Sequence, residues 1–365
     1  MGTGISLCMI VRDEEDTLGR CLSNAREYAD EIVIADTGSR DGTPALAKRL
    51  ADKVCSFEWR DDFAAARNFS FSLASGDYLM WLDADDVVKS SEIGKLLALK
   101  RSLRDDRPDT VMCRYESAVD ERGETSCVYY RERIMSRSSE PVWQGRVHEC
   151  VPPRGKIVYS DFTVTHLKTR PSPPGRNLSI YRAAEARGEP LSPRDKFYFG
   201  RELLGAGLTD EAERTLEAAA LDPEGWYVNR IEACSALAVC RERKGDPEGA
   251  LAALFLSLAL GEPRSGVLSA IASLMRKTGR IGEAAFWYES AMRCRDHSPE
   301  GDFDDPRTRS VIPLLGLTEC YWLLGKKAES RACHERLLTM APAHPTVIKN
   351  SGFFAAHPET EDGGT

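Results

Sequence analysis

Two carboxylates at alternate positions form the most informative motif of the chain. Asp83 and Asp85 come directly after the hydrophobic segment 78–82, and Asp86 follows them. Where a strand ends, alternate carboxylates can bind one divalent cation, because hard cations prefer oxygen ligands. The same cation could bridge two phosphate groups. A solvated acidic loop, or the acidic start of a helix at residues 90–92, would leave a similar pattern.

Polar residues also follow two other apolar segments. Arg12 and Glu14 follow residues 5–11, and Asp36 ends residues 31–36 before a turn rich in glycine and serine. In parallel α/β sheets, ligands bind beyond the carboxyl ends of the strands. We therefore predict that these loops and the aspartate motif converge on one edge of a sheet and form the active site there.

The elements that must position these residues alternate between strands and helices. The expected strands are residues 5–11, 31–36, 53–59 and 78–82, with helices between them. Strands separated by helices form βαβ units and a mostly parallel sheet. After them come β-rich segments, then a proline-rich break, then a helical region. The predicted division is an α/β domain over residues 1–170, a linker over 171–176, a helical domain over 177–350 and a disordered tail over 351–365.

The helical region is repetitive. Ala250 and Ala284 are 34 residues apart, which is the period of a tetratricopeptide helix pair. Related landmarks fall at Ala212 and Ala328, with longer intervals that indicate insertions. Because one helix pair cannot bury its apolar face alone, stacked repeats are expected to supply the core of this domain.

Composition and charge limit the possible functions. The 365 residues include 49 basic and 57 acidic side chains, for a net charge of −8. Without a long basic run, this balance argues against nucleic acid as the main partner. No segment approaches the roughly 18 apolar residues that cross a bilayer. Eleven scattered cysteines without a CxxC pair indicate reduced, buried thiols, so a cytoplasmic location is expected.

Four segments in a fixed order resemble one family. They are residues 5–15 (ISLCMIVRDEE), 31–43 (EIVIADTGSRDGT), 63–68 (FAAARN) and 82–86 (LDADD). Together they resemble the family 2 glycosyltransferases with a GT-A fold, in particular the subgroup that joins this domain to C-terminal tetratricopeptide repeats. That subgroup includes the peptide S-glycosyltransferases of glycosylated bacteriocins. The resemblance covers roughly residues 4–90, with weaker support to about residue 170.

The resemblance implies a nucleotide-sugar site at the predicted edge. Asp36 would bond the nucleotide base, the Arg12–Glu14 loop would line the base and ribose, and Arg67 would lie at the base or the diphosphate. Asp83 and Asp85 would lie at the ribose and at a Mn²⁺ or Mg²⁺ ion that holds the diphosphate. Independently of the family, a departing nucleoside diphosphate needs positive charge from a cation or from arginines. Without the family, Arg67 would read as a surface helix residue and Asp36 as a turn cap.

The segment from Trp143 to Glu149 is expected to supply the catalytic group. Trp143 fits a wall for a sugar ring, and an inverting transferase needs a carboxylate or imidazole to take the proton of the acceptor. We predict Glu149 as this base, with His148 as its neighbour or substitute. A His–Glu hydrogen bond that only braces the loop is the alternative. His166 is a candidate third metal ligand or phosphate contact, or else an ordinary strand-end histidine.

The sequence thus predicts an inverting glycosyltransferase whose donor is a nucleotide sugar, expected to be a UDP-sugar. The acceptor is expected to be a peptide Cys, Ser or Thr, with a surface polysaccharide or lipopolysaccharide as the alternative. The repeats would present this acceptor or form a homodimer. Competing interpretations are an inactive repeat scaffold and a nucleotidyltransferase, although the latter normally carries a Gly-rich basic loop that residues 5–16 lack.

Overall fold

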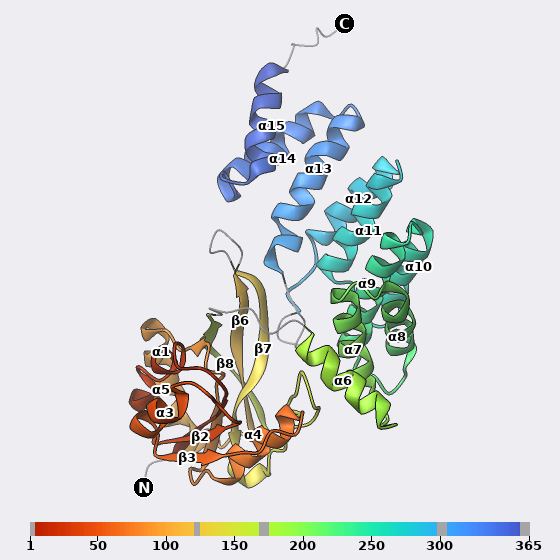
Figure 1. Cartoon of the computed structure of the whole chain (residues 1–365). Coiled ribbons are helices and arrows are strands. Elements are labelled where there is room, and N and C mark those ends of the chain that lie inside the picture. Colours follow the sequence, from red (N-terminus) through yellow and green to blue (C-terminus); the bar gives the residue numbers. More distant parts are fainter. Residues whose placement is uncertain (1–3, 120–124, 168–174, 298–304, 358–365) are drawn as a thin grey trace, which may run out of the picture. The chain divides into compact units, whose positions relative to one another are not determined.

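A computed structural model describes residues 4–119, 125–167, 175–297 and 305–357 of the chain (Figure 1). The chain divides into two units, one reaching to Ala206 and one beginning at Gly207. The first unit contains the sheet and also helices α6 (Arg176–Ala186) and α7 (Pro193–Gly205). From the sequence we expected these two helices among the repeats. Most of the expected linker, residues 171–174, lies outside the described residues.

The described part of the first unit has eight strands in one mixed sheet. They are β1 (Ile5–Val11), β2 (Glu31–Asp36), β3 (Lys53–Ser56), β4 (Tyr78–Trp81), β5 (Asp86–Val87), β6 (Thr110–Val119), β7 (Thr125–Ser136) and β8 (Ile157–His166). Their order is β3-β2-β1-β4-β7-β6-β8-β5. Neighbours from β3 to β4 are parallel, β7 is antiparallel to β4 and β6, and β8 is parallel to β6 but antiparallel to β5. The predicted fold class, an α/β domain followed by a helical domain, is confirmed.

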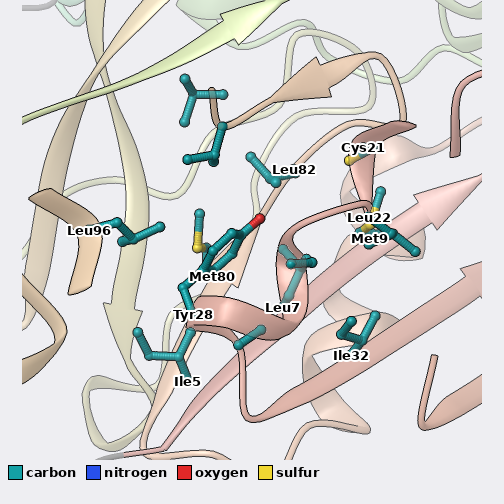
Figure 2. Packing of buried hydrophobic residues seen from close by; sticks show 14 of the residues in the cluster. Ile5, Leu7, Met9, Cys21, Leu22, Tyr28, Ile32, Met80, Leu82 and Leu96 are labelled. Carbon is teal, nitrogen blue, oxygen red and sulfur yellow. The ribbon is translucent and has the colours of Figure 1, made fainter. Parts of the chain in front are cut away.

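The two faces of the sheet carry alternate residues of the same strands, because successive side chains of a strand point to opposite faces. Ile5, Leu7 and Met9 of β1 belong to the larger core, and Figure 2 shows them in one cluster with Met80 of β4. Cys8 belongs to a second core on the other face. The helices of the larger core are α1 (Leu18–Cys21), α2 (Ala25–Tyr28), α3 (Thr43–Leu50) and α5 (Ser90–Asp106), and α4 (Phe63–Ser72) packs in the second.

The described part of the second unit is helical. Its helices are α8 (Thr209–Leu221), α9 (Tyr227–Arg243), α10 (Pro247–Ser257), α11 (Ser265–Lys277), α12 (Ile281–Ala291), α13 (Val311–Leu323), α14 (Lys327–Met340) and α15 (Pro345–Ala356). Helices α9 and α10, α11 and α12, and α13 and α14 pack as pairs, as tetratricopeptide-like repeats do. Residues 351–356, which we expected in a disordered tail, form the end of α15.

Small buried residues mark the repeat. Ala212, Ala250 and Ala284 are the fourth residues of α8, α10 and α12, and all three are fully buried. In α14 the fourth residue is Ser330, also fully buried, and its hydroxyl donates to a backbone carbonyl of α13. The predicted landmark Ala328 is wrong, since it is exposed. A serine occupies the position because it is nearly as small as alanine and finds an acceptor there.

Two further observations concern the cysteines and the length of the helices. No disulfide joins any of the eleven cysteines, all of which lie among the described residues. Within those residues, every helix is too short or too polar to cross a membrane.

Candidate active site

Hydrogen bonds connect the loop after β1 (residues 12–17) with the loop after β2 (residues 37–42), and we call these two loops the rim. The two strands are parallel and in register to their ends, so their loops leave the same edge of the sheet. The amide of Asp13 donates to Oγ of Ser39 (3.0 Å), and the amide of Arg40 donates to Oδ1 of Asp13 (2.6 Å). Two loops that are far apart in the sequence therefore hold each other's shape.

Asp36, at the end of β2, bonds the described part of the chain through one of its carboxylate oxygens. Its Oδ1 accepts hydrogen bonds from the amides of Gly38 (2.9 Å) and Ser39 (2.8 Å). Gly38 has a φ of 100°, a conformation that favours glycine. Among the described residues, Oδ2 of Asp36 has no hydrogen-bond partner. The turn-cap role is thus present, and it leaves one oxygen available to a ligand.

Arg12 and Glu14 lie on the same rim in different surroundings. Arg12 is exposed, directly beyond β1. The amide of Glu14 donates to Oγ1 of Thr43 (2.7 Å), and its carboxylate accepts a hydrogen bond from Oγ1 of Thr17 (2.5 Å). Arg12 can therefore contact a ligand, while Glu14 also helps to hold the rim.

Three side chains suited to metal binding gather beyond the end of β4. Nδ1 of His166 lies 3.4 Å from Oδ1 of Asp85 and 3.3 Å from Oδ1 of Asp86. The three ligand atoms lie within 4.8 Å of one another. Such separations fit ligands that share one divalent cation at about 2.0–2.6 Å. The structure thus brings together two of the three predicted ligands, Asp85 and His166, and adds Asp86, whereas Asp83 bonds elsewhere.

Asp86 is fully buried and anchored by a buried arginine. Its Oδ2 accepts hydrogen bonds from Nη1 of Arg133 (2.9 Å) and the amide of Asp83 (3.1 Å), and its Oδ1 accepts one from the hydroxyl of Tyr115 (2.9 Å). Burial opposes the charged form, but Arg133 and His166 outweigh it and hold the pKa of Asp86 below its usual range. Asp86 is therefore ionised and held in one position.

Asp85 and His166 show that this edge has more carboxylates than cations. Burial and the neighbouring Asp83 and Asp86 raise the pKa of Asp85 to about 6, although His166 acts in the opposite direction. Burial opposes protonation of His166, yet the hydrogen bond with Asp86 and the nearby carboxylates raise its pKa overall. A divalent cation would relieve this excess of negative charge, so the residues present fit a metal site.

Arg67 of α4 links the acidic edge to the segment that carries Glu149. Its Nη2 lies 2.6 Å from Oδ1 of Asp83, and its Nε lies 2.6 Å from Oε1 of Glu149. The guanidinium carbon is 4.8 Å from the ring centroids of both Trp81 and Trp143. Burial opposes its charge, but the two carboxylates outweigh burial and raise the pKa of Arg67. Arg67 is thus a buried cation that packs against two neighbouring indoles, and the interpretation as a surface helix residue is wrong.

Trp143 lies in the interior, whereas we expected an exposed wall for a sugar ring. Its residue exposure is 2%. Its amide donates to Oδ1 of Asn68 (2.8 Å), and Nδ2 of Asn68 donates to its carbonyl (3.0 Å). Its indole packs edge-on against Trp81, with 4.9 Å between ring centroids. Trp143 therefore acts on the site through the guanidinium that it supports.

The neighbours His148 and Glu149 face different partners. Glu149 bonds Arg67 through Oε1, and its Oε2 has no hydrogen-bond partner among the described residues. Nε2 of His148 lies 2.9 Å from Oε1 of Glu202 on α7. No hydrogen bond between His148 and Glu149 is present in the described structure. The carboxylate of Glu149 thus lies at the acidic edge, whereas the imidazole of His148 contacts α7.

Several residues of the site were not singled out from the sequence. Asp86 was expected at the acidic edge but was not predicted as a metal ligand, and its position beside the motif was the only signal. Arg133 and Tyr115 lie on strands where alternating polar residues normally indicate a solvent-facing side. Glu202 lies on a helix that the sequence assigned to the repeats, so nothing in its surroundings marked it.

Comparison with known proteins gives consistent findings. Residues 6–153 match the family model described as Glycosyl transferase family 2. The chain is 29% identical over 299 residues to a TPR repeat-containing protein of Synechococcus elongatus, covering 79% of this chain and 66% of that protein. It is 28% identical over 226 residues to the SPbeta prophage-derived glycosyltransferase SunS of Bacillus subtilis, covering 58% and 51%.

A solved structure, S. aureus TarS 1–349, aligns with a TM-score of 0.38 and 12% identity over 70% of this chain and 90% of that one. The chain spans between half and two thirds of the length of the two curated relatives.

Proposed function

We propose that this chain, whose residues 6–153 match the family model of glycosyl transferase family 2, transfers a sugar from a nucleoside diphosphate sugar to an acceptor nucleophile. One observation carries the proposal. The same sheet edge holds Asp36, with a carboxylate oxygen available to a ligand, and the cluster of Asp85, Asp86 and His166. A carboxylate acceptor suits the N–H groups of a base, and the cluster suits the cation that accompanies a diphosphate.

A Mn²⁺ or Mg²⁺ ion held by Asp85, Asp86 and His166 would neutralise charge on the departing nucleoside diphosphate. The residues of the chain itself bind and orient the donor. Arg12 adds positive charge at the rim. Asp83, which pairs with Arg67, would accept a hydrogen bond from the ribose.

Asp36→Asn is expected to weaken donor binding about 10-fold or more, since a hydrogen bond to a charged group contributes about 1.5–3 kcal/mol. The amide oxygen can still accept from the loop amides, while the second position becomes a donor. Calorimetric titration with UDP, GDP and dTDP measures the change and identifies the nucleotide. Asp105→Asn, at an exposed position of α5, is the matched control. Equal affinities for the two variants would remove Asp36 from the nucleotide site.

Glu149 is the proposed base, and it would take the proton of the acceptor at Oε2 as the acceptor attacks the anomeric carbon. Glu149→Gln keeps an acceptor for Arg67 but removes the basic carboxylate, so kcat is expected to fall about 100-fold with donor affinity unchanged. Glu140→Gln, an exposed carboxylate in the preceding loop, is the control. The anomeric configuration of the product, read by NMR, tests inversion directly. Retention of configuration would contradict this role.

A peptide Cys, Ser or Thr is the proposed acceptor, with a surface glycan as the alternative. Helical repeats form concave surfaces that suit an extended chain, which supports the peptide. Donor hydrolysis with UDP-, GDP- and dTDP-sugars, followed by intact-mass measurement of candidate peptides, tests both parts. Absence of nucleotide binding and of hydrolysis with every donor would favour the inactive scaffold.

The buried positions of Cys8, Cys21 and Cys113 fit thiols that pack as small apolar groups, and the cytoplasm is the proposed location.

A further inference from the structure

The chain makes an unusual turn immediately before Glu149. His148 has a φ of 53°, in the left-handed region that residues with a Cβ rarely occupy. Such a conformation costs free energy and persists only where the surroundings hold it. The turn decides which way Glu149 leaves the backbone. Whatever holds His148 therefore also orients the carboxylate.

One stripe of α7 holds His148 at three points. Arg194 donates to the His148 carbonyl from Nε (3.2 Å) and Nη2 (2.9 Å). The ring of Tyr198 stacks on the imidazole, with 4.2 Å between centroids and 12° between planes. Oε1 of Glu202 lies within hydrogen-bond distance of Nε2 of the imidazole, at 2.9 Å. These three residues are spaced four apart, so they follow one face of the helix.

The stripe is itself held in place. Nδ2 of Asn177 on α6 donates to Oε1 of Glu202 (3.0 Å). The hydrogen bond from His148 lowers the pKa of Glu202 despite partial burial, which keeps this carboxylate ionised. At its start, α7 has a capping box between Ser192 and Asp195. The helix thus presents a fixed surface to the turn.

We propose that α7 belongs to the catalytic unit and that Arg194, Tyr198 and Glu202 are positioning residues that act on Glu149 through His148. The imidazole of His148 is an anchor and does not take the proton. On the other side of the turn, Nη2 of Arg131 donates to the Glu149 carbonyl (3.2 Å), so Glu149 is held by its backbone as well as by Arg67. This inference rests on the proposed function, because orientation of Glu149 matters only if it acts in transfer.

Glu202→Ala in the full-length protein is expected to lower kcat about 10- to 100-fold, the usual effect of losing a group that orients a ligating or reacting side chain. Donor KM and nucleotide affinity should not change, since the substitution does not touch the rim formed by the loops after β1 and β2. Hydrogen exchange of residues 143–151 should become faster. Glu202→Gln, which still bonds an imidazole, should recover most of kcat. Glu224→Ala, at an exposed position between α8 and α9, is the matched control.

The outcomes separate the two hypotheses. If the wild-type protein transfers sugar and Glu202→Ala retains full kcat, the positioning role is wrong and the proposed function stands. A parallel loss of kcat, nucleotide affinity and thermal stability in Glu202→Ala would also overturn the inference, because it would indicate a purely structural role. If the wild-type protein neither binds a nucleotide nor hydrolyses any donor, the proposed function fails and this inference fails with it.

Discussion

Asp85→Ala is expected to lower the rate of sugar transfer about 1000-fold while leaving the fold intact, a loss comparable to removing a group that stabilises transition-state charge. Asp85 is the more exposed carboxylate of the cluster, with 25% side-chain exposure against 0% for Asp86. It is therefore the ligand that an entering cation meets. Removing it also relieves the like-charge repulsion among the carboxylates, so the fold should not suffer. Initial rates across a Mn²⁺ titration measure the effect, with circular dichroism as the check on folding.

The control for this prediction is Asp161→Ala. Asp161 is an exposed aspartate on β8, the strand that ends at His166, and it lies outside the cluster. Its rate should match that of the wild-type protein. Chelation of the wild-type protein with EDTA should reproduce the loss seen in Asp85→Ala, and added Mn²⁺ or Mg²⁺ should reverse it. Full turnover in Asp85→Ala, or in EDTA, would rule out the metal-dependent mechanism.

Arg133→Met is expected to reduce the free energy of unfolding by about 3–5 kcal/mol, because it removes the buried guanidinium that pairs with the buried carboxylate of Asp86. Both side chains have 0% exposure, and they are 2.9 Å apart. The lost guanidinium also lies 3.7 Å from the ring centroid of Trp81, so packing is lost as well. Urea unfolding followed by tryptophan fluorescence measures the change.

A double variant tests the physical reason. When Asp86→Leu is added to Arg133→Met, both charges are gone and the pair is replaced by apolar groups, so the double variant should be more stable than Arg133→Met alone. Arg114→Met, at an exposed position of the neighbouring strand β6, should leave the unfolding midpoint unchanged. If Arg133→Met unfolds at the wild-type midpoint, the buried ion pair does not contribute to stability.

The part of the site built on β1, β2 and β4 could be predicted from the sequence. In each case an apolar run ends in polar residues, and parallel strands bring those ends together. This pattern was enough to find Asp36 and the aspartate motif. It was not enough to separate Asp83 from Asp86, because adjacent carboxylates look alike until a partner is seen. Arg67 pairs with Asp83, and Arg133 pairs with Asp86.

The remaining parts depend on contacts between distant segments. Arg133 is 47 residues from Asp86 in the sequence, and Glu202 is 54 residues from His148. No local periodicity reports such pairs. The repeat register failed at Ala328 for a different reason, since the small-residue pattern accepts serine as readily as alanine and Ser330 took the position. The sequence likewise did not reveal that Trp143 is buried, because an indole can pack against a sugar ring or in a protein interior equally well.

If α7 positions Glu149 as proposed, the end of the first unit at Ala206 marks where such proteins could exchange parts without loss of catalysis. The match to the family model ends at residue 153. A gene fusion at that point would separate His148 from all three of its partners on α7. A fusion after Ala206 would keep them together and could attach a new array of repeats. If α7 positions Glu149 as proposed, recombination that preserves sugar transfer should carry α6 and α7 with the sheet, so these two helices should be inherited together with it.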